Sequence, residues 1–561
     1  MDRIVINLGD FLKNAGIVGL NYILDDVICA EKDKDYGYTS DRQAIWLSRD
    51  FALNCDWTDV YFKAFTKYYR KHSMYQAVID EINSILVVIE GENFKLKDKK
   101  DELEFINKKL LSNSYKSGFA SVKDQLDMIQ PYEDLQAQKL KDTMDVKEAK
   151  RRLEELLLFL KQPVCEETFV MKSALYNYIN FFWDGKCFLL RANAAKNMRE
   201  VFETDFAVPL REYIKKSHDK GKDICIDCGN LISGKEKVSI AFMKDMADDL
   251  SRKRSAFWNC KVDAFLCPVC AYIYALAPLG FLIIGRRYVF MNISSDIDNL
   301  LAANNKYGHE SEESQKKVEK EEKYSSWIAR TINILLKIKT EGLSNIQVIT
   351  RGINDTDTYT FDVISKDVLS VLKDKGIKNS IDLLSKHPYV KSGSDYINVH
   401  ESVILNILRY RSQYDLINTL LKIAIETNGV VYTAANVYDV QLRTNVHNID
   451  TDKKKGGIIM NRYSVRDRGY ELRNTLLLAK GATDDSCIRG TVYQLLNALS
   501  VGNVDRFIEI VLRVYCSTKL QIPNEFVECL GDQARFKEYG YAFLLGLKGC
   551  HYEKKEEITN E

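Results

Sequence analysis

Residues 225–228 read CIDC and residues 267–270 read CPVC, with 38 residues between the two pairs. Each C-x2-C pair can form a tight turn that offers two thiolates to one face of a metal ion. Two such pairs complete a tetrahedral shell of four sulfurs, which suits Zn²⁺. Gly229 follows the first pair, where such a turn often needs a positive φ. We therefore expect a structural zinc ion bound by Cys225, Cys228, Cys267 and Cys270.

Other interpretations of these cysteines stay open. Free cysteine packs as a small hydrophobic residue, so the four could be unrelated core residues, although their regular spacing argues against this. A redox pair of the thioredoxin type would need a βαβ setting, which the sequence does not suggest. Four thiolates leave no coordination position for water, so the expected zinc ion stabilises the fold and does no chemistry. Cys260 lies between the pairs and is interpreted as a packing residue.

Length and composition indicate a globular protein with more than one domain. The chain has 561 residues, of which 46% are hydrophobic and 28% are charged. Its 80 Lys and Arg residues balance 79 Asp and Glu residues, so the net charge argues neither for nor against a polyanionic partner. The apolar stretch 271–284 is interrupted by Pro278 and Gly280 and is too short to span a bilayer, so we expect it in the core. Thirteen cysteines without a secretion signal predict reduced thiols and a cytoplasmic location, with no membrane partner.

Hydrophobic periodicity predicts both helices and strands. Residues 9–24 are expected to form a helix with Asp10 as its N-cap. The segment 147–161 reads KEAKRRLEELLLFLK, a strong helix pattern that Pro163 is expected to end. Strands are expected over three further segments: 84–90, 237–242 and 348–365.

The C-terminal part of the sequence predicts a bundle. The charged stretch 309–326 is interpreted as a solvated helix or linker, and 450–461, with its two glycines, as a break. Four helical patterns with short connections follow and predict an antiparallel arrangement: 463–480, 486–500, 504–519 and 525–548. The expected fold is α+β, with four parts: a mixed α/β body over 1–221, a four-cysteine zinc-binding insertion over 222–292, a mixed α/β continuation over 293–455 and a C-terminal antiparallel four-helix bundle over 460–550.

Two basic clusters are candidates for nucleic-acid binding. Residues 211–261 carry 12 Lys and Arg against 8 Asp and Glu, and basic side chains beside aromatic and amide groups suit phosphate and base contacts. In the expected bundle, four arginines fall within one helix. An ordinary solvated loop explains the first cluster equally well, a solvated helix face is the alternative for the second, and the aromatics of 61–71 are expected in the core. The candidates are Arg252, Lys253, Arg254, Asn259 and Lys261, and Arg462, Arg466, Arg468 and Arg473.

The sequence favours a protein without catalytic activity. It contains no Walker P-loop, no G-x-S-x-G, no H-E-x-x-H and no kinase signature. Its seven histidines are scattered, and His218-Asp219 is a lone dipeptide without the further ligands that a metal-dependent phosphohydrolase would need. We therefore expect no catalytic residues.

Several motifs, in this order, resemble the large subunits of type I-B CRISPR Cascade complexes. The N-terminal GDFLKNAGIVGL is one. The central CxxC is followed by an aromatic-Asn element, CPVCAYIYALAPLGF and a strand ending in VFMN. Near the C-terminus come GYELRNTLLLAK, YQLLNALSVGNVDRFIEIVLRVY, IPNEF and GYAFLLGLKG. Residues 72–200 and 300–450 carry no motif of this kind, so the resemblance rests on both ends and the middle of the chain.

The resemblance implies a role in RNA-guided antiviral defence. Such a subunit sits at the 5′ end of the guide CRISPR RNA, which the backbone and guide-processing subunits of Cascade hold. It inspects the protospacer-adjacent motif on double-stranded DNA, helps to open the duplex, and recruits a helicase-nuclease in trans. Guide pairing then reads sequence while the protein reads the motif. The resemblance does not assign the motif-reading residues; Arg252, Lys253, Asn259 and Lys261 are candidates by chemistry alone.

Met460 marks a possible second product. Large subunits of this family often carry a small helical subunit at the C-terminus that is also made separately, and Met460 is the only methionine after Met291. Lys455-Gly456-Gly457 could be encoded as a purine-rich ribosome-binding sequence just upstream. We predict a small helical subunit made from Met460; the alternative is that Lys-Gly-Gly is simply a linker.

Overall fold

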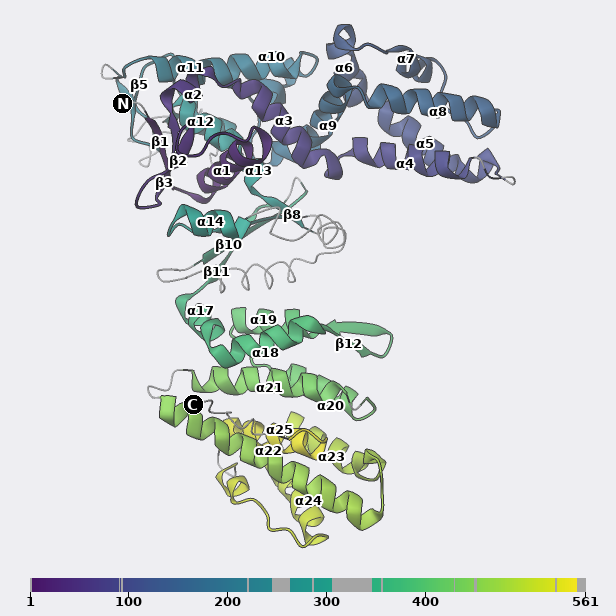
Figure 1. Cartoon of the computed structure of the whole chain (residues 1–561), viewed down its shortest axis with the longest axis vertical. Coiled ribbons are helices and arrows are strands. Elements are labelled where there is room, and N and C mark those ends of the chain that lie inside the picture. The colour runs from purple at the N-terminus through teal and green to yellow at the C-terminus, as the bar shows by residue number, and fades with distance from the viewer. Residues whose placement is uncertain are drawn as a thin grey trace, which may run out of the picture. The chain divides into compact units, whose positions relative to one another are not determined.

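The structure is a computed structural model that combines helices with antiparallel sheets, which confirms the α+β class. It describes residues 3–89, 91, 94–218, 221–244, 263–284, 287–304, 346–354, 357–427, 429–447, 452–529 and 532–551. Two compact units form: 1–321 with 342–363, and 322–341 with 364–561 (Figure 1). We call them unit 1 and unit 2 and describe each separately. The expected boundaries at 221, 292 and 455 lie on a finer scale than this division and stay predictions.

Unit 1 begins with a small antiparallel sheet and a buried helix. Strands β1 (Arg3–Asn7), β2 (Tyr36–Tyr38) and β3 (Ala44–Ser48) pair in the order β1-β3-β2. Helix α1 (Phe11–Tyr22) follows β1, and the Asp10 side chain accepts hydrogen bonds from the backbone N–H groups of Leu12 and Lys13. The predicted helix and its N-cap are therefore confirmed.

The aromatic segment 61–71 lies in the core of unit 1. After α2 (Arg49–Asn54), helix α3 (Trp57–Tyr69) buries its aromatic rings. The Tyr61 ring lies 4.1 Å from the rings of Phe65 and Phe202, measured between centroids. Packing of this kind confirms the core interpretation, since rings enclosed by other rings cannot also stack on bases.

Six helices follow in the chain: α4 (Met74–Val88), α5 (Lys100–Leu110), α6 (Asn113–Val122), α7 (Gln130–Ala137), α8 (Val146–Leu160) and α9 (Pro163–Asn177). The strand expected over 84–90 is wrong, because α4 runs through Val88. Val78, Ile82 and Ile85 are buried at helical spacing, and this packing overrides the β-branched composition. The helix over 147–161 is confirmed. Pro163, however, begins α9, where its missing N–H costs nothing.

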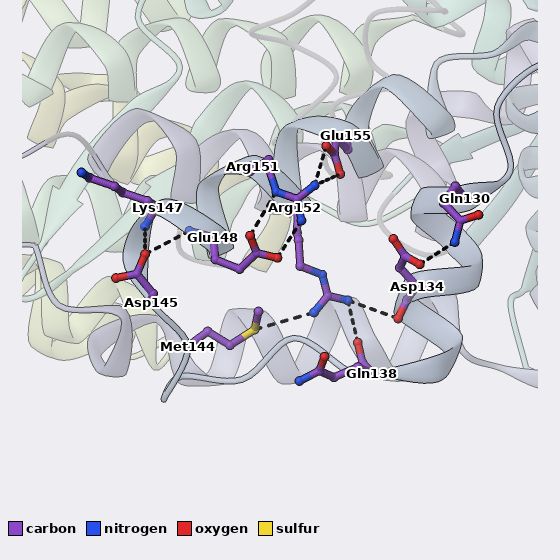
Figure 2. A network of polar contacts seen from close by, with 10 residues as sticks. All are labelled: Gln130, Asp134, Gln138, Met144, Asp145, Lys147, Glu148, Arg151, Arg152 and Glu155. Atoms are coloured by element: carbon purple, nitrogen blue, oxygen red, sulfur yellow. Dashed lines mark hydrogen bonds and ion pairs between the residues drawn. The ribbon is translucent and has the colours of Figure 1, made fainter.

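A polar network joins α7 to the start of α8 (Figure 2). The Arg152 guanidinium donates to the carbonyl oxygens of Asp134 (3.3 Å) and Gln138 (2.6 Å) and lies 3.9 Å from the Met144 sulfur. It thereby satisfies carbonyls at the C-terminal end of α7, where a helix leaves them without internal partners. On the exposed side of α8, Arg151 pairs with Glu148 and Glu155.

The rest of unit 1 surrounds the cysteine pairs. Helices α10 (Met198–Phe202) and α11 (Val208–Lys215) precede them, and α12 (Pro268–Ala275), α13 (Ala277–Gly280) and α14 (Ile297–Asn304) follow. A four-stranded antiparallel sheet has the order β11-β10-β9-β8, formed by β8 (Leu282–Ile284), β9 (Arg287–Asn292), β10 (Ile346–Gly352) and β11 (Tyr359–Ile364). The strand predicted over 348–365 is thus confirmed as two strands.

The apolar stretch 271–284 is core, as predicted. Residues 271–281 are buried throughout, and α1 packs directly against them. A Cβ atom added at Gly16 would lie 2.1 Å from the carbonyl oxygen of Ile273, and one at Gly280 would lie 2.1 Å from that of Ala15. None of the helices that the structure describes is both long enough and apolar enough to cross a membrane.

Unit 2 is mainly helical. Helices α17 (Lys366–Lys373) and α18 (Lys375–Lys386) lead to the hairpin β12 (Tyr389–Ser392) and β13 (Asp395–Asn398). Three helices follow it: α19 (Val399–Leu408), α20 (Tyr414–Ala424) and α21 (Val430–Val446).

The four predicted C-terminal helices are α22 (Asp452–Lys480), α23 (Arg489–Ser500), α24 (Val504–Cys516) and α25 (Gln533–Leu547). The expected break over 450–461 is wrong, since α22 begins at Asp452 and includes both glycines. The stretch 309–326 lies outside the described residues.

Candidate metal centre

Two short hairpins hold the four cysteines. Strands β4 (Asp223–Ile224) and β5 (Leu231–Ile232) pair across the first C-x2-C turn, and Gly229 in that turn has φ +73°, as expected. The amide of Gly229 donates to the carbonyl of Cys225 (3.0 Å), which closes the turn. The predicted strand over 237–242 is only two residues long, β6 (Val238–Ser239), and pairs with β7 (Phe265–Leu266). The second C-x2-C pair follows β7 directly.

The hairpins bring the two pairs together across the long insertion. The amide of Ile226, inside the first turn, donates to the carbonyl of Phe265 (2.9 Å), which precedes the second pair. Cys267 is the N-cap of α12, and its sulfur accepts from the amide of Cys270 at 3.4 Å. The sulfur of Cys225 accepts from the amide of Cys267 at 3.2 Å. Backbone N–H groups aimed at sulfur are typical of thiolate ligands, because they stabilise negative charge.

The sulfur positions fit a metal ion. The four ligand atoms all lie within 4.8 Å of one another, and those of Cys228 and Cys267 are 3.7 Å apart. A tetrahedral Zn–S length of about 2.3 Å places two sulfurs about 3.8 Å apart. All four side chains are buried or half-buried. Cys225, Cys228, Cys267 and Cys270 can therefore hold a metal ion with the geometry of a closed four-sulfur site.

The charge balance of the cluster favours a cation. Hydrogen bonds with Cys228, Cys267 and Cys270 lower the pKa of Cys225, whereas hydrogen bonds with Cys225, Cys228 and Cys267 raise the pKa of Cys270. Four thiols this close share protons, because several adjacent thiolates would repel one another. A divalent metal removes this conflict, since it lets all four sulfurs ionise.

A buried ion pair ties the cluster to α1. The Lys13 ammonium lies 2.9 Å from Asp227, and only 3% of Lys13 is exposed. Burial lowers the pKa of Lys13, but the Asp227 carboxylate and the cysteines raise it more, so its pKa ends above the ordinary value. Lys13 is therefore a buried cation beside the cysteine cluster. Sequence reasoning missed it, because Lys13 is 214 residues from Asp227 and no local pattern marks it.

The basic candidates fall into two groups. Arg252, Lys253, Arg254, Asn259 and Lys261 lie outside the described residues, as does Cys260, and their role stays a prediction. Described residues on either side of these candidates in the sequence do meet. The amide of Ile240 donates to the carbonyl of Ala264 (3.1 Å), next to the β6–β7 pairing. Residues 240 and 264 are therefore held side by side.

The four bundle arginines lie on α22 but do not form one surface. Arg462 is buried and pairs with Glu538 at 2.7 Å, and the Arg466 side chain is 5% exposed, 3.9 Å from Asp439. Arg473 pairs with the buried Asp485, which also lies 3.2 Å from Lys548. Arg468 is half-exposed and pairs with Glu471. Of the four, Arg468 is the one whose side chain is more than half exposed.

Comparison with known proteins identifies a family that matches part of the chain. Residues 218–282, which include both cysteine pairs, match the family model described as CRISPR-associated protein (Cas_CXXC_CXXC). No curated protein and no solved structure matches the chain. The matched residues are those that carry the four-cysteine geometry, so the motif and the site coincide. The chain is a CRISPR-associated protein with a CXXC–CXXC module.

Proposed function

We propose that this CRISPR-associated protein is the large subunit of a type I-B RNA-guided surveillance complex. The family match over the four-cysteine module carries the proposal, because it sits at the same place in the motif order that resembles Cascade large subunits. In this role the chain binds guide CRISPR RNA and target double-stranded DNA, together with the backbone and guide-processing subunits, in the cytoplasm. It recognises the protospacer-adjacent motif and aids unwinding. A helicase-nuclease recruited in trans then cuts, so the chain itself is not an enzyme.

The metal in this proposal is a structural zinc ion. When bound, it supplies rigidity through four thiolate ligands and has no free position for a substrate. The chain's own residues support the site in two ways. Lys13 offsets the charge of the cluster, and the β4–β5 and β6–β7 hairpins fix the two C-x2-C turns relative to each other.

The motif-reading residues of this proposal lie between the cysteine pairs. Arg252, Lys253 and Arg254 would hold phosphates, and Asn259 and Lys261 would contact base edges. Support comes from the hydrogen bond between Ile240 and Ala264, which brings together described residues on both sides of these candidates in the sequence, three residues before Cys267. On this proposal Asn259→Ala relaxes motif preference, whereas Lys253→Ala weakens all DNA about equally.

The decisive experiment is to purify the tagged chain from its native cells and sequence the RNA that accompanies it. Short RNAs of one length class with a constant repeat-derived 5′ segment are expected. Recovery of no RNA, or of a random sample of cellular RNA, would overturn the proposal. It would favour a stand-alone zinc-containing nucleic-acid-binding protein, which binds DNA without a guide.

The proposed product starting at Met460 is tested separately. Met460 lies within α22, and the Tyr438 hydroxyl of α21 donates to the carbonyl of Glu538 (2.9 Å) in α25. A chain starting at Met460 would lack α21 and leave this side of α25 uncovered. A C-terminally tagged gene with native codons is expected to give the short species by intact mass. Synonymous recoding of codons 455–457 should reduce it; an unchanged level would contradict the ribosome-site idea.

A further inference from the structure

The β12–β13 hairpin of unit 2 displays two unpartnered tyrosines on one face. The register pairs Tyr389 with Asn398 and Lys391 with Tyr396, so these four side chains lie on the same face. Tyr389 is 60% exposed and Tyr396 is 66% exposed. Val390 points the other way and is buried. Thus the inner face anchors the hairpin, and the outer face presents two rings to solvent.

The turn of the hairpin keeps this face in register. Gly393 has φ +63° at the first position of a two-residue turn, a conformation that such hairpin turns require. A one-residue slip would move both tyrosines to the inner face. The arrangement of the two rings is thus fixed by the backbone, and Figure 1 shows the hairpin as an arm beside α18 and α19.

Two large exposed rings on one face are unusual for a surface that only meets water. Within the described residues, neither tyrosine contacts another ring or gives its hydroxyl to a hydrogen bond, and Lys391 forms no ion pair. The three side chains are therefore available together. An exposed aromatic pair with a free ammonium between its members combines the two groups that bind single-stranded nucleic acid, a stacking surface and a phosphate partner.

A hollow of about 380 Å³ lies beside β12. One wall is His387, Tyr389, Val390 and Lys391, and the other is the junction of α20 and α21, at Thr427, Gly429, Val430 and Thr433. In the described part of this lining no side chain is acidic, and the Lys391 and His387 side chains are basic. The hollow therefore suits a phosphate rather than a cation, and its volume is in the range of pockets that hold small ligands.

We propose that the outer face of the β12–β13 hairpin and the adjoining hollow bind single-stranded nucleic acid, with Tyr389 and Tyr396 stacking on bases and Lys391 holding a phosphate. This inference rests on the proposed function, in which such strands exist, and adds a binding surface to it. The same chemistry would hold a displaced DNA strand or an exposed RNA segment, because every base has a π face.

The test measures binding of the purified full chain to fluorescent dT15, U15 and a matched duplex by anisotropy. Tyr389→Thr and Tyr396→Thr remove the rings but keep strand propensity. Each is expected to weaken single-strand binding by roughly five- to 100-fold. Tyr389→Phe and Tyr396→Phe, which keep the ring, should bind nearly as the wild type. Tyr176→Thr is the matched control, an exposed tyrosine on α9 in unit 1, and should change nothing.

Salt dependence separates stacking from charge. Lys391→Gln should reduce the slope of log K against log salt by about 0.7, whereas the threonine variants should weaken binding with the slope unchanged. Tighter binding of dT15 than U15 would assign the surface to a displaced DNA strand, and the reverse order to RNA. Equal binding by wild type and both threonine variants, with hairpin amides unchanged in hydrogen exchange, would overturn the inference.

The two proposals fail separately. Guide RNA recovery from cells tests the proposed function and does not depend on Tyr389 or Tyr396, so the threonine variants should still carry guide RNA. Loss of guide RNA from the wild type would remove the surveillance-complex role. Unchanged oligonucleotide binding in the threonine variants would remove the hairpin surface alone.

Discussion

Asp485 lies between two cations in unit 2, the partly exposed Arg473 and the buried Lys548. Its carboxylate pairs with Arg473 and with Lys548, and the side chains of Asp485 and Lys548 are at most 7% exposed. Asp485→Asn would remove the carboxylate charge that Arg473 and the buried Lys548 share. We expect a loss of about 3 kcal/mol or more in the free energy of unfolding, measured by urea denaturation followed by far-UV circular dichroism.

An exposed ion pair on α24 provides the control. Glu509 lies 2.6 Å from Arg506, with side chains 61% and 47% exposed. Glu509→Gln should change the free energy of unfolding by less than about 1 kcal/mol, since water screens such pairs. Equal effects of the two substitutions would show that burial does not set the strength of the Asp485 pairs.

Cys270 tests the metal centre at the level of one atom. Cys270→Ser replaces a thiolate with a hydroxyl, which is a poor zinc ligand, and should lower the zinc content of the purified chain well below one ion per chain. Elemental analysis by mass spectrometry measures this. Cys516→Ser, an exposed cysteine outside the cluster, should keep the full metal content. A full zinc content in the Cys270 variant would exclude a four-sulfur site.

At the residue scale, sequence spacing predicted the metal centre but not its surroundings. A C-x2-C pair is a local pattern, because its two sulfurs are brought together by the turn between them. Lys13 has no such pattern, since its partner Asp227 is far along the chain. The local sequence around Arg462 and Arg466 predicts surface charges for the same reason. Their carboxylate partners, Glu538 and Asp439, lie on other helices.

Helix α1 and the α12–α13 segment approach backbone to backbone. A side chain at Gly16 would meet the carbonyl oxygen of Ile273, so Gly16→Ala must push the two segments apart. We expect a loss of about 1–3 kcal/mol in the free energy of unfolding of unit 1, measured by hydrogen exchange of α1 and α12 amides. Gly234→Ala is the control, because no atom lies within 4 Å of an added Cβ there. A neutral Gly16→Ala would contradict this close packing.

Helices were predicted better than short strands. The 147–161 pattern gave α8 because its apolar residues repeat at helical spacing over four turns. The strand prediction for 84–90 was wrong because β-branched residues favour strands only where a neighbouring strand exists to pair with. Here the neighbours of α4 are other helices, α5, α8 and α9, and they select the helical conformation. The two glycines of 450–461 gave a wrong prediction for another reason: glycine inside a helix costs only about 1 kcal/mol each, so α22 runs through them.

Metal removal should affect the molecule unevenly. We expect a strong chelator to increase hydrogen exchange in residues 221–244 and 263–284 and in the facing part of α1, since the hairpins there are too short to hold without the ion. Unit 2, whose core is separate, should exchange as before. Uniform change in both units, or none, would contradict a zinc-dependent module within unit 1.

Acid should have the same effect as the chelator. Zinc needs deprotonated thiolates, so protons compete with the ion more strongly as pH falls. Zinc release should therefore be absent near pH 8 and increase steadily toward acid pH, as a chromogenic zinc indicator would record. Lys13 stays charged from pH 8 down to acid pH. Its ion pair with Asp227 therefore does not reverse the increase of zinc release toward acid pH. Retention of zinc in strong acid would contradict binding through thiolates that protons can displace.

The sequence by itself determined the features that depend on neighbours along the chain: the two C-x2-C turns, the positive φ at Gly229, the N-cap at Asp10, the core character of 271–281 and the helices α22 to α25. Tertiary structure decided whatever depends on residues that meet from far apart. It made α4 a helix, buried Arg462 and Arg466, and placed Lys13 against the cysteine cluster. The physical reason is that backbone turns and periodicity are local, whereas burial and ion pairing are set by which surfaces meet after folding.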